Sequence, residues 1–325
     1  MIELKNVTKK YGPTTAVDDI SFEVKDGEIV GLLGPNGAGK TTTMNMITGY
    51  IEQTSGQILV NGNDILKKPN KVKKQIGYMP EGTPLYYELT PKEFISYMAE
   101  LKLVKRKERK DEVARVLKEV GIEDVQDRLI KNLSRGYKQR VSLAGALVGN
   151  PDVIILDEPT VGLDPKQITE IRELIKKLGK KHTVILSSHI LSEVSQICER
   201  VIIINKGKIV AIDTPENLEK ATRDNNAISI TIEDPKNNIN KIKEKIKEIS
   251  KVDFIKDNDD GTKEYAIISS SNLDLRKKLF DVLPKMDIVI FELKKSETTL
   301  EEAFIKLIDN SKNNETKSNK KEEKK

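Results

Sequence analysis

The chain has 325 residues, enough for about two domains at the usual ~100–200 residues each. Lysine and arginine number 56 against 51 aspartates and glutamates, and a net charge of only +5 argues against a strongly basic nucleic-acid binder. The single cysteine, Cys198, excludes an internal disulfide and fits a reducing compartment.

The apolar segments are short throughout the chain. The first ten residues, MIELKNVTKK, contain no apolar core of a signal peptide. No apolar run approaches the ~18–20 residues that span a bilayer. We therefore expect a soluble, cytoplasmic chain that reaches a membrane only through a partner.

The first eighty residues predict short strands and tight turns around one strand–loop–helix unit. SFEVKDGEIVGLLG predicts two strands about an Asp-Gly turn. Asn61-Gly62, in QILVNGNDI, is a hairpin signal.

The strand–loop–helix unit contains a complete phosphate-binding loop (P-loop). GPNGAGKT fills every fixed position of the pattern G-x4-G-K-[ST], an apolar strand precedes it and a helix follows it. Its glycines let backbone amides approach a phosphate at the helix N-terminus. We expect Lys40 to reach the β and γ phosphates and Thr41 to bind Mg²⁺. The expected nucleotide-binding residues are Gly34, Pro35, Asn36, Gly37, Ala38, Gly39, Lys40, Thr41 and Thr42.

The middle of the chain predicts helices. Residues 90–120 predict helix, with an N-cap at Thr90-Pro91 and an end at Gly121. LSRGYKQR, residues 133–140, opens the small apolar run VSLAGALVGN, which predicts another helix. The segment LSRGYKQR carries no acid–base pair or metal ligand set, but a polar, glycine-bearing helix N-terminus can bind an anion.

Two all-apolar runs, VIILDEP (153–159) and HTVILSSH (182–189), predict buried parallel strands with a helix between them. Asp157 would lie near the metal at the end of the first strand. Glu158 would polarise a water molecule at its tip. GTPases read guanine with Asn-Lys-x-Asp, and the nearest run, NKGK at residues 205–208, lacks the aspartate, so adenine is favoured.

The pattern changes near residues 213–226. It then predicts the order βαββαβ, typical of a small ferredoxin-like α+β domain over residues 226–310, without a catalytic constellation. Its first helix is indicated by apolar spacing and its last by a capping box. The apolar residues of the first helix are Ile239, Ile242, Ile246 and Ile249, and the capping box of the last helix is Thr299 and Glu302. Polar residues 311–325 are expected to be disordered.

GPNGAGKTT, LSRGYKQR, VIILDEPTVGLDP and SSH occur in the order found in ATP-binding-cassette (ABC) ATPases. Over residues 1 to about 220 the chain resembles this family. The resemblance implies an α/β P-loop core with an antiparallel β subdomain and a helical subdomain near residues 83–145, together a domain of residues 1–225. It also implies ATP and Mg²⁺ as cofactors.

The resemblance further implies a second cassette subunit. In this family the segment matching LSRGY binds ATP held by the other subunit, so Ser134 and Gly136 would serve a partner in a homodimer. Asp164 would cross the dimer interface. Tyr11 would stack on adenine, and His189 would contact the γ-phosphate as a catalytic residue beside Glu158 and Lys40.

Three positions depart from the family pattern. Arg135 and Tyr137 replace the glycine and glutamine of the signature. Glu81 replaces a glutamine that touches the metal or the attacking water in most cassettes, and glutamate keeps an acceptor but loses a donor.

YMPE and LSRGY resemble the branch that powers ABC-2-type exporters, including gliding-motility and sodium- or drug-efflux cassettes. This implies a separate integral membrane permease, with the chain held at the inner face of the cell membrane. Tyr86, Tyr87 and Leu89 are candidate permease contacts, or simply packing residues of the helical subdomain. The sequence does not name the cargo.

Two other functions compete with transport. A soluble ABC ATPase could act on nucleic acid or the ribosome, but KRKERK (105–110) is the one basic cluster of note. The interval between Lys40 and Ser134 has no room for the coiled coils of DNA-repair cassettes, and translation-factor cassettes carry two P-loops. A regulatory subunit with little turnover is disfavoured by Glu158. We expect no nucleic-acid partner.

Overall fold

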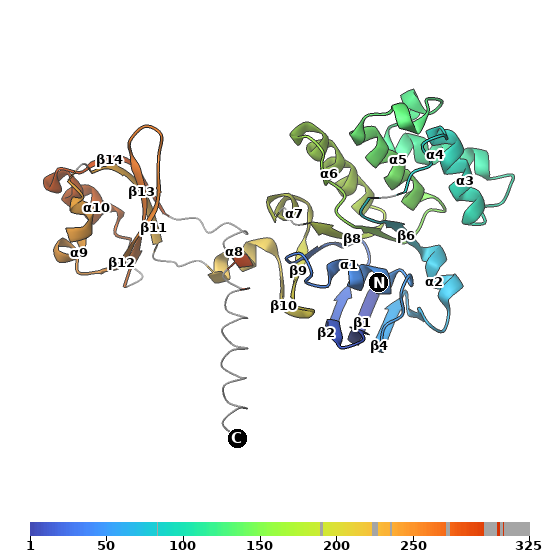
Figure 1. Cartoon of the computed structure of the whole chain (residues 1–325), viewed down its shortest axis with the longest axis horizontal. Helices are drawn as coiled ribbons and strands as arrows, with labels where there is room; N and C mark the ends of the chain where they lie inside the picture. The colour runs from blue at the N-terminus through green and yellow to red at the C-terminus, as the bar shows by residue number, and fades with distance from the viewer. Residues whose placement is uncertain are drawn as a thin grey trace, which may run out of the picture. The chain divides into compact units, whose positions relative to one another are not determined.

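The computed structural model describes residues 1–82, 84–188, 191–222, 227–234, 236–270 and 274–295, and also residues 304, 305 and 308 (Figure 1). The chain divides into two compact units, Met1–Pro215 and Glu216–Asp309. This division precedes the expected boundary at residue 225, so α8 (Pro215–Thr222) is grouped with the second unit. The expected polar tail lies outside the described residues.

One sheet of the first unit is antiparallel, with four strands in the order β2-β1-β4-β5. Its strands are β1 (Ile2–Tyr11), β2 (Thr14–Val24), β4 (Ser55–Val60) and β5 (Asn63–Asp64). The predicted hairpin at Asn61-Gly62 is confirmed, since φ is 48° and 70° at these residues, as a type I′ turn requires. The Asp26-Gly27 turn does not close a hairpin, because it leads from β2 into a second sheet.

The second sheet has six strands in the order β10-β9-β3-β8-β7-β6 and is parallel except for β10 at one edge. Its strands are β3 (Ile29–Leu33), β6 (Ile76–Met79), β7 (Val153–Leu156), β8 (Thr183–Ser188), β9 (Arg200–Asn205) and β10 (Lys208–Asp213). Every residue of β7 and β8 is buried, which confirms the two predicted parallel strands. Their carboxyl ends meet at one edge of the sheet, where ligands of such folds bind.

Helices surround the parallel sheet in Figure 1, and three of them form the helical subdomain. The helices near the sheet are α1 (Lys40–Ile47), α2 (Pro69–Gln75), α6 (Pro165–Gly179) and α7 (Leu191–Ile197). The subdomain contains α3 (Pro91–Leu101), α4 (Arg109–Val120) and α5 (Arg135–Leu147), with short 3₁₀ turns at Glu123–Val125 and Ile130–Asn132.

The helix ends in the subdomain follow their predicted signals. Thr90 caps α3 and shares a capping box with Glu93, and Gly121 ends α4 in the left-handed conformation. The expected helical region 90–120 is two helices rather than one. Leu103 lies between them with a φ of 59°, a backbone conformation that no helix continues.

The second unit confirms the βαββαβ order. Its antiparallel sheet has the order β12-β13-β11-β14. The strands are β11 (Ala227–Glu233), β12 (Ile249–Asp257), β13 (Lys263–Ser269) and β14 (Val289–Lys295). The helical segments are η3 (Asn238–Lys241), α9 (Ile242–Lys245), α10 (Arg276–Val282) and η4 (Leu283–Met286).

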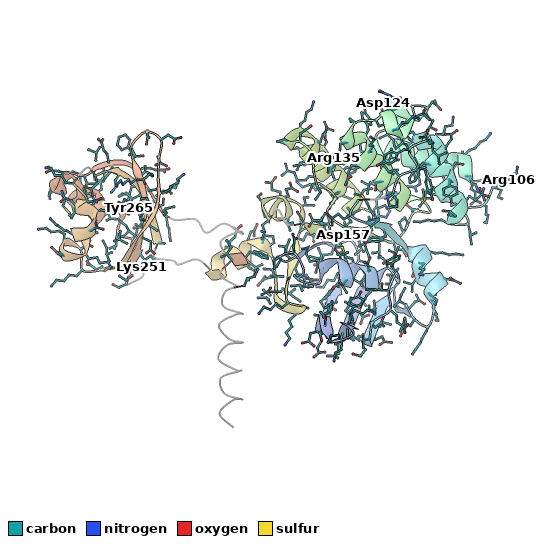
Figure 2. All side chains as sticks on the ribbon, in the orientation of Figure 1. Arg106, Asp124, Arg135, Asp157, Lys251 and Tyr265 are labelled. Carbon is teal, nitrogen blue, oxygen red and sulfur yellow. The ribbon has the colours of Figure 1, made fainter. Side chains whose placement is uncertain are left out.

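A separate apolar core holds the second unit together, and Tyr265 lies in it (Figure 2). Ile239, Ile242 and Ile246 are buried there as predicted. The expected helix is shorter than predicted, because Ile249 already begins β12. Isoleucine suits a strand as well as a helix, so its spacing alone does not separate the two. The expected capping box at Thr299 and Glu302 lies outside the described residues.

No helix in the described part of the chain has the length and apolar character needed to cross a membrane. The helical subdomain carries the basic cluster 105–110 on its outer side, where Arg106 projects away from the sheet (Figure 2). This placement agrees with an exposed, solvated cluster.

Candidate nucleotide-binding site

The P-loop connects β3 to α1, as its sequence predicts. At Gly39 the φ is 108°, and a Cβ would lie 2.7 Å from the carbonyl oxygen of Ala16. At Gly34 a Cβ would lie 2.3 Å from the carbonyl oxygen of Ile204. Both positions therefore require glycine, and the loop packs closely against neighbouring backbone.

Lys40 is buried at the base of the loop. Its ammonium group donates to the carbonyl oxygens of Gly34, at 2.8 Å, and Pro35, at 3.3 Å. The side chain is thus held inside the loop and directed at the space that the loop surrounds. This is the position from which a lysine can reach a bound phosphate.

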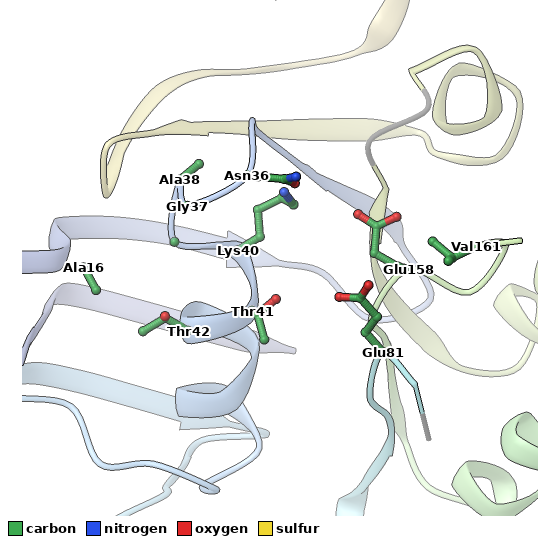
Figure 3. Close-up of a pocket in the computed structure, with 11 residues that line it drawn as sticks. Ala16, Asn36, Gly37, Ala38, Lys40, Thr41, Thr42, Glu81, Glu158 and Val161 are labelled. Carbon is green, nitrogen blue, oxygen red and sulfur yellow. The ribbon is translucent and has the colours of Figure 1, made fainter. Parts of the chain in front are cut away.

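A cavity of about 670 Å³ opens beside the loop. Its lining combines the loop and helix start at residues 36–42 with Ala16, Glu81, Glu158 and Val161. In Figure 3, Lys40 and Thr41 lie on one side of the cavity, and the carboxylates of Glu81 and Glu158 point in from the other. The structure therefore brings together most of the residues that the sequence predicts for phosphate, metal and water.

Asp157 directly follows β7 and is almost completely buried. One carboxylate oxygen, Oδ1, accepts a hydrogen bond of 2.6 Å from the hydroxyl of Ser187. The other, Oδ2, is buried and has no hydrogen-bond partner among the described residues. A buried carboxylate oxygen without a partner is costly unless a cation binds it, so the residue fits a Mg²⁺ ligand.

The charge of Asp157 also acts on a neighbouring phenol. Burial first, and the Asp157 carboxylate second, raise the pKa of Tyr78 to about 12. Tyr78 therefore stays protonated at all ordinary pH values and donates to the side-chain oxygen of Asn45, at 3.0 Å. Asn45 belongs to α1, so this bond ties the helix that begins with Lys40 to β6.

Glu158 has an unusual backbone for its residue type. Its φ is 51°, in the left-handed region that favours glycine. Its N–H donates to Ser187 Oγ, at 2.9 Å, and this is the hydroxyl that donates to Asp157. A single serine at the end of β8 therefore orients both acidic residues. Such strain persists where the surrounding structure holds it, which is common at functional sites.

Motif reasoning did not identify the contacts of Ser187, which bonds both acidic residues, or of Thr160, which lies two residues after Glu158. Ser187 belongs to the SSH run, which was the one sequence signal that pointed to it. Thr160 donates to the Glu193 carboxylate, at 2.6 Å, in a buried contact with α7. Glu193 follows His189 closely in the chain. His189 itself lies outside the described residues, and its role stays a prediction.

Tyr11 and Asp164 do not line the cavity. Tyr11 ends β1 and is 49% exposed, and the Lys9 ammonium lies 5.0 Å from its ring centre. Asp164 caps α6, where its carboxylate accepts a hydrogen bond from the N–H of Gln167. Their roles in adenine stacking and at a dimer interface stay predictions.

The segment LSRGYKQR, residues 133–140, is called the signature corner here and lies at the start of α5. Ser134 is its N-cap, with Oγ accepting from the N–H of Tyr137 at 3.4 Å. Gly136 is buried against Gln167. Neither Ser134 nor Gly136 lines the cavity of its own chain. The Tyr137 hydroxyl donates to the Asp124 carboxylate, at 2.7 Å.

Comparison with known proteins identifies close similarities. Residues 17–161 match the family model described as ABC transporter. The bacitracin transport ATP-binding protein BcrA of Bacillus licheniformis is 36% identical over 310 residues, which cover 95% of this chain and 97% of that protein. The linearmycin resistance ATP-binding protein LnrL of Bacillus subtilis is 39% identical over 71% of this chain and 75% of its own length.

A solved structure shares the architecture of the first unit. It is the dimeric post-hydrolysis state of the ATP-binding cassette MJ0796 bound to ADP and Pi. The two chains are 29% identical with a TM-score of 0.60, over 66% of this chain and 98% of the other.

Proposed function

This chain belongs to the ABC transporter family as an ATP-binding and ATP-hydrolysing subunit, and we propose from this premise that two identical copies close around two ATP molecules and drive an exporter-type membrane permease. The cavity beside the P-loop carries the proposal. It joins Lys40 and Thr41 to the catalytic candidate Glu158, next to the buried Asp157 carboxylate.

Each residue has a role that follows from its position. The P-loop amides and Lys40 bind the β and γ phosphates, while Thr41 and Asp157 hold Mg²⁺. Mg²⁺, when bound, offsets phosphate charge. Glu158 orients or deprotonates the attacking water, and Glu81 supplies a second carboxylate on the same side of the cavity. His189 would contact the γ-phosphate.

Closure of a dimer explains why the signature corner lies apart from its own cavity. Ser134 and Gly136 would bind the ATP held by the partner subunit, so that ATP favours the closed state over the open one. Hydrolysis would then release that state. Asp164, at the start of α6, would face the partner across the interface.

The helical subdomain offers surface for a permease at the inner face of the membrane. Tyr86 and Tyr87 are about half exposed, and Tyr86 stacks edge-on against Tyr97 at 5.4 Å between ring centres. Exposed aromatic side chains are enriched in protein interfaces. BcrA and LnrL carry names for bacitracin transport and linearmycin resistance, which supports an export role and leaves the cargo of this chain open.

Replacing Glu158 tests the mechanism. Glu158→Gln should lower kcat at least 100-fold, because it removes the base while leaving the phosphate contacts intact. With ATP and Mg²⁺ it should elute as a stable dimer in size-exclusion chromatography with light scattering. Lys40→Ala is the control and should stay monomeric. A Glu158→Gln protein that remains a monomer at saturating ATP would contradict the mechanism.

The same variant tests the membrane partner. Tagged Glu158→Gln protein, expressed in its own cells with ATP and Mg²⁺ present during gentle solubilisation, should co-purify a protein with several membrane spans. Recovery of ribosomes or nucleic acid in its place would replace the transport role by the alternative function.

A further inference from the structure

Arg135 occupies a signature position and is bonded within its own subunit. One guanidinium N–H donates to the carbonyl oxygen of Val161, at 3.2 Å. The guanidinium also covers Gly162 so closely that a Cβ there would lie 2.0 Å from its central carbon. Arg135 therefore holds the turn that follows Glu158.

A second bond from the same helix reaches this turn. The side-chain amide of Gln139, one helical turn beyond Arg135, donates to the carbonyl oxygen of Pro159, at 2.6 Å. The N–H of Val161 in turn donates to the carbonyl oxygen of Glu158, at 3.3 Å. α5 thus contacts the segment 158–162 at two carbonyls, and a short hydrogen-bonded turn joins those contacts to Glu158.

A small cavity of about 310 Å³ marks the same junction. Arg135 and Gln139 line it together with Glu81, Glu158 and Val161, and the last three also line the nucleotide cavity. Lys138 lines it as well, so two positively charged side chains lie beside two carboxylates, and Arg135 is the one that donates to Val161. A glycine at this position would supply neither the charge nor the hydrogen bond.

We propose that Arg135 is a positioning residue that couples the anion site at Ser134 and Gly136 to Glu158 of the same subunit. This rests on the proposed function, in which that anion site binds the partner's ATP. Arg135 stands between Ser134 and Gly136 in the chain, so ordering of this corner by the partner's nucleotide moves its guanidinium. Its bond to Val161 then transmits the change to the turn after Glu158.

Mixed dimers separate this role from direct contact with the partner's nucleotide. In the reference dimer one subunit is unchanged and the other carries Glu158→Gln, so only one site turns over. Arg135→Gly placed on the subunit with the intact Glu158 should lower kcat about tenfold with little change in KM, the effect expected for one lost charge-assisted hydrogen bond. Placed on the Glu158→Gln subunit, the same change should leave turnover as in the reference.

Two further variants control for charge and chemistry. Lys138→Ala removes the other positive charge from the lining of the same cavity, and should leave kcat unchanged because its ammonium lies over the Tyr87 ring, 5.5 Å from the ring centre. Arg135→Lys keeps a charged donor and should recover part of the lost kcat. Equal losses for the Lys138→Ala and Arg135→Gly substitutions would show that charge alone matters and would overturn the proposal.

The contact with Gly162 gives an independent test. Gly162 has a φ of 69°, so Gly162→Ala strains the backbone in any background. The added methyl group also displaces the Arg135 guanidinium, which the Arg135→Gly background lacks. Gly162→Ala should therefore lower kcat by a larger factor in the Arg135 protein than in the Arg135→Gly background.

The outcomes distinguish failure of the role of Arg135 from failure of the proposed function. Three results would overturn the role of Arg135 without affecting the proposed function. Arg135→Gly could lower turnover when placed on the Glu158→Gln subunit, or it could lower turnover in neither placement. Gly162→Ala could also lower kcat by the same factor with and without Arg135. Absence of ATP hydrolysis by the unchanged homodimer would contradict the proposed function and, with it, the premise of the coupling.

Discussion

Glu158 and Asp157 are adjacent residues with different surroundings. Asp157 is almost completely buried, whereas Glu158 lines the nucleotide cavity from a left-handed backbone conformation. Motif order predicts both residues, which directly follow the buried parallel strand β7, together with Lys40, which follows the P-loop after β3. The hydrogen bonds of Ser187 could not be predicted, because they join residues far apart in the chain whose register depends on the packed sheet.

Glu81 is the site residue whose chemistry departs furthest from the family pattern. Glu81→Gln removes one negative charge from the side of the cavity that also holds Glu158. If Glu81 faces the metal, the Mg²⁺ concentration for half-maximal ATP hydrolysis should rise several-fold, because Mg²⁺ prefers charged oxygen ligands.

A magnesium titration of steady-state turnover measures this effect. Glu88→Gln is the matched control, since Glu88 forms an exposed ion pair with Lys131, and such pairs contribute little. An unchanged magnesium dependence for Glu81→Gln would remove Glu81 from the metal site.

Helix ends account for much of what local sequence could predict at the scale of elements. The capping box at Thr90 and the left-handed Gly121 follow from residues close in the chain. The break at Leu103 and the strand start at Ile249 could not be predicted, because tertiary packing decides where an apolar helical pattern stops. The same limit applies to Arg135, whose partner carbonyl belongs to another element.

The end of α5 illustrates a tertiary contact with a pH dependence. Lys102 donates to the carbonyl oxygens of Ala146, at 3.2 Å, and Val148, at 2.9 Å. Burial lowers the pKa of Lys102 to about 8 from its ordinary value of 10.5. Between these two values the unfolded chain holds a proton that the folded protein has lost, so the free energy of unfolding rises with pH across this window.

Lys102→Met should abolish that rise. The stability of the wild-type protein relative to the variant should increase by about 2–3 kcal/mol between pH 8 and 10.5, at about 1.4 kcal/mol per unit of pKa. Urea unfolding at several pH values measures it. Lys105→Met, a nearby exposed lysine, should show no such change, and parallel pH curves for wild type and Lys102→Met would contradict the assignment.

The two units have separate cores, each described within its own residues. One contains side chains from both sheets of the first unit, and the other consists largely of isoleucines such as Ile230 and Ile267. Strand order along the chain predicted the βαββαβ unit, because alternating apolar residues mark its strands. The strand order β12-β13-β11-β14 agrees with the expected ferredoxin-like unit, whereas the division at Pro215 depends on long-range contacts that no local pattern contains.

Separate cores predict separable unfolding. Ile230→Ala leaves a cavity under the sheet of the second unit and should lower the stability of that unit by about 2–5 kcal/mol. ATP hydrolysis should be unchanged at temperatures where the unit stays folded. Ile155→Ala, in the first core, should lower a different calorimetric transition, and a single shared transition for both variants would contradict independent cores.

The pairing of β3 has a consequence for the order of events during synthesis. β3 ends in the P-loop, and its neighbours are β8 and β9, with Ile29 opposite Val184 and Val30 opposite Arg200. At about 5–20 residues per second, a ribosome needs roughly 10–30 seconds to supply them after β3 has emerged. A growing chain that ends before β9 lacks a neighbour of the strand that carries the nucleotide loop, so the loop reaches its final form only when nearly the whole first unit has been made.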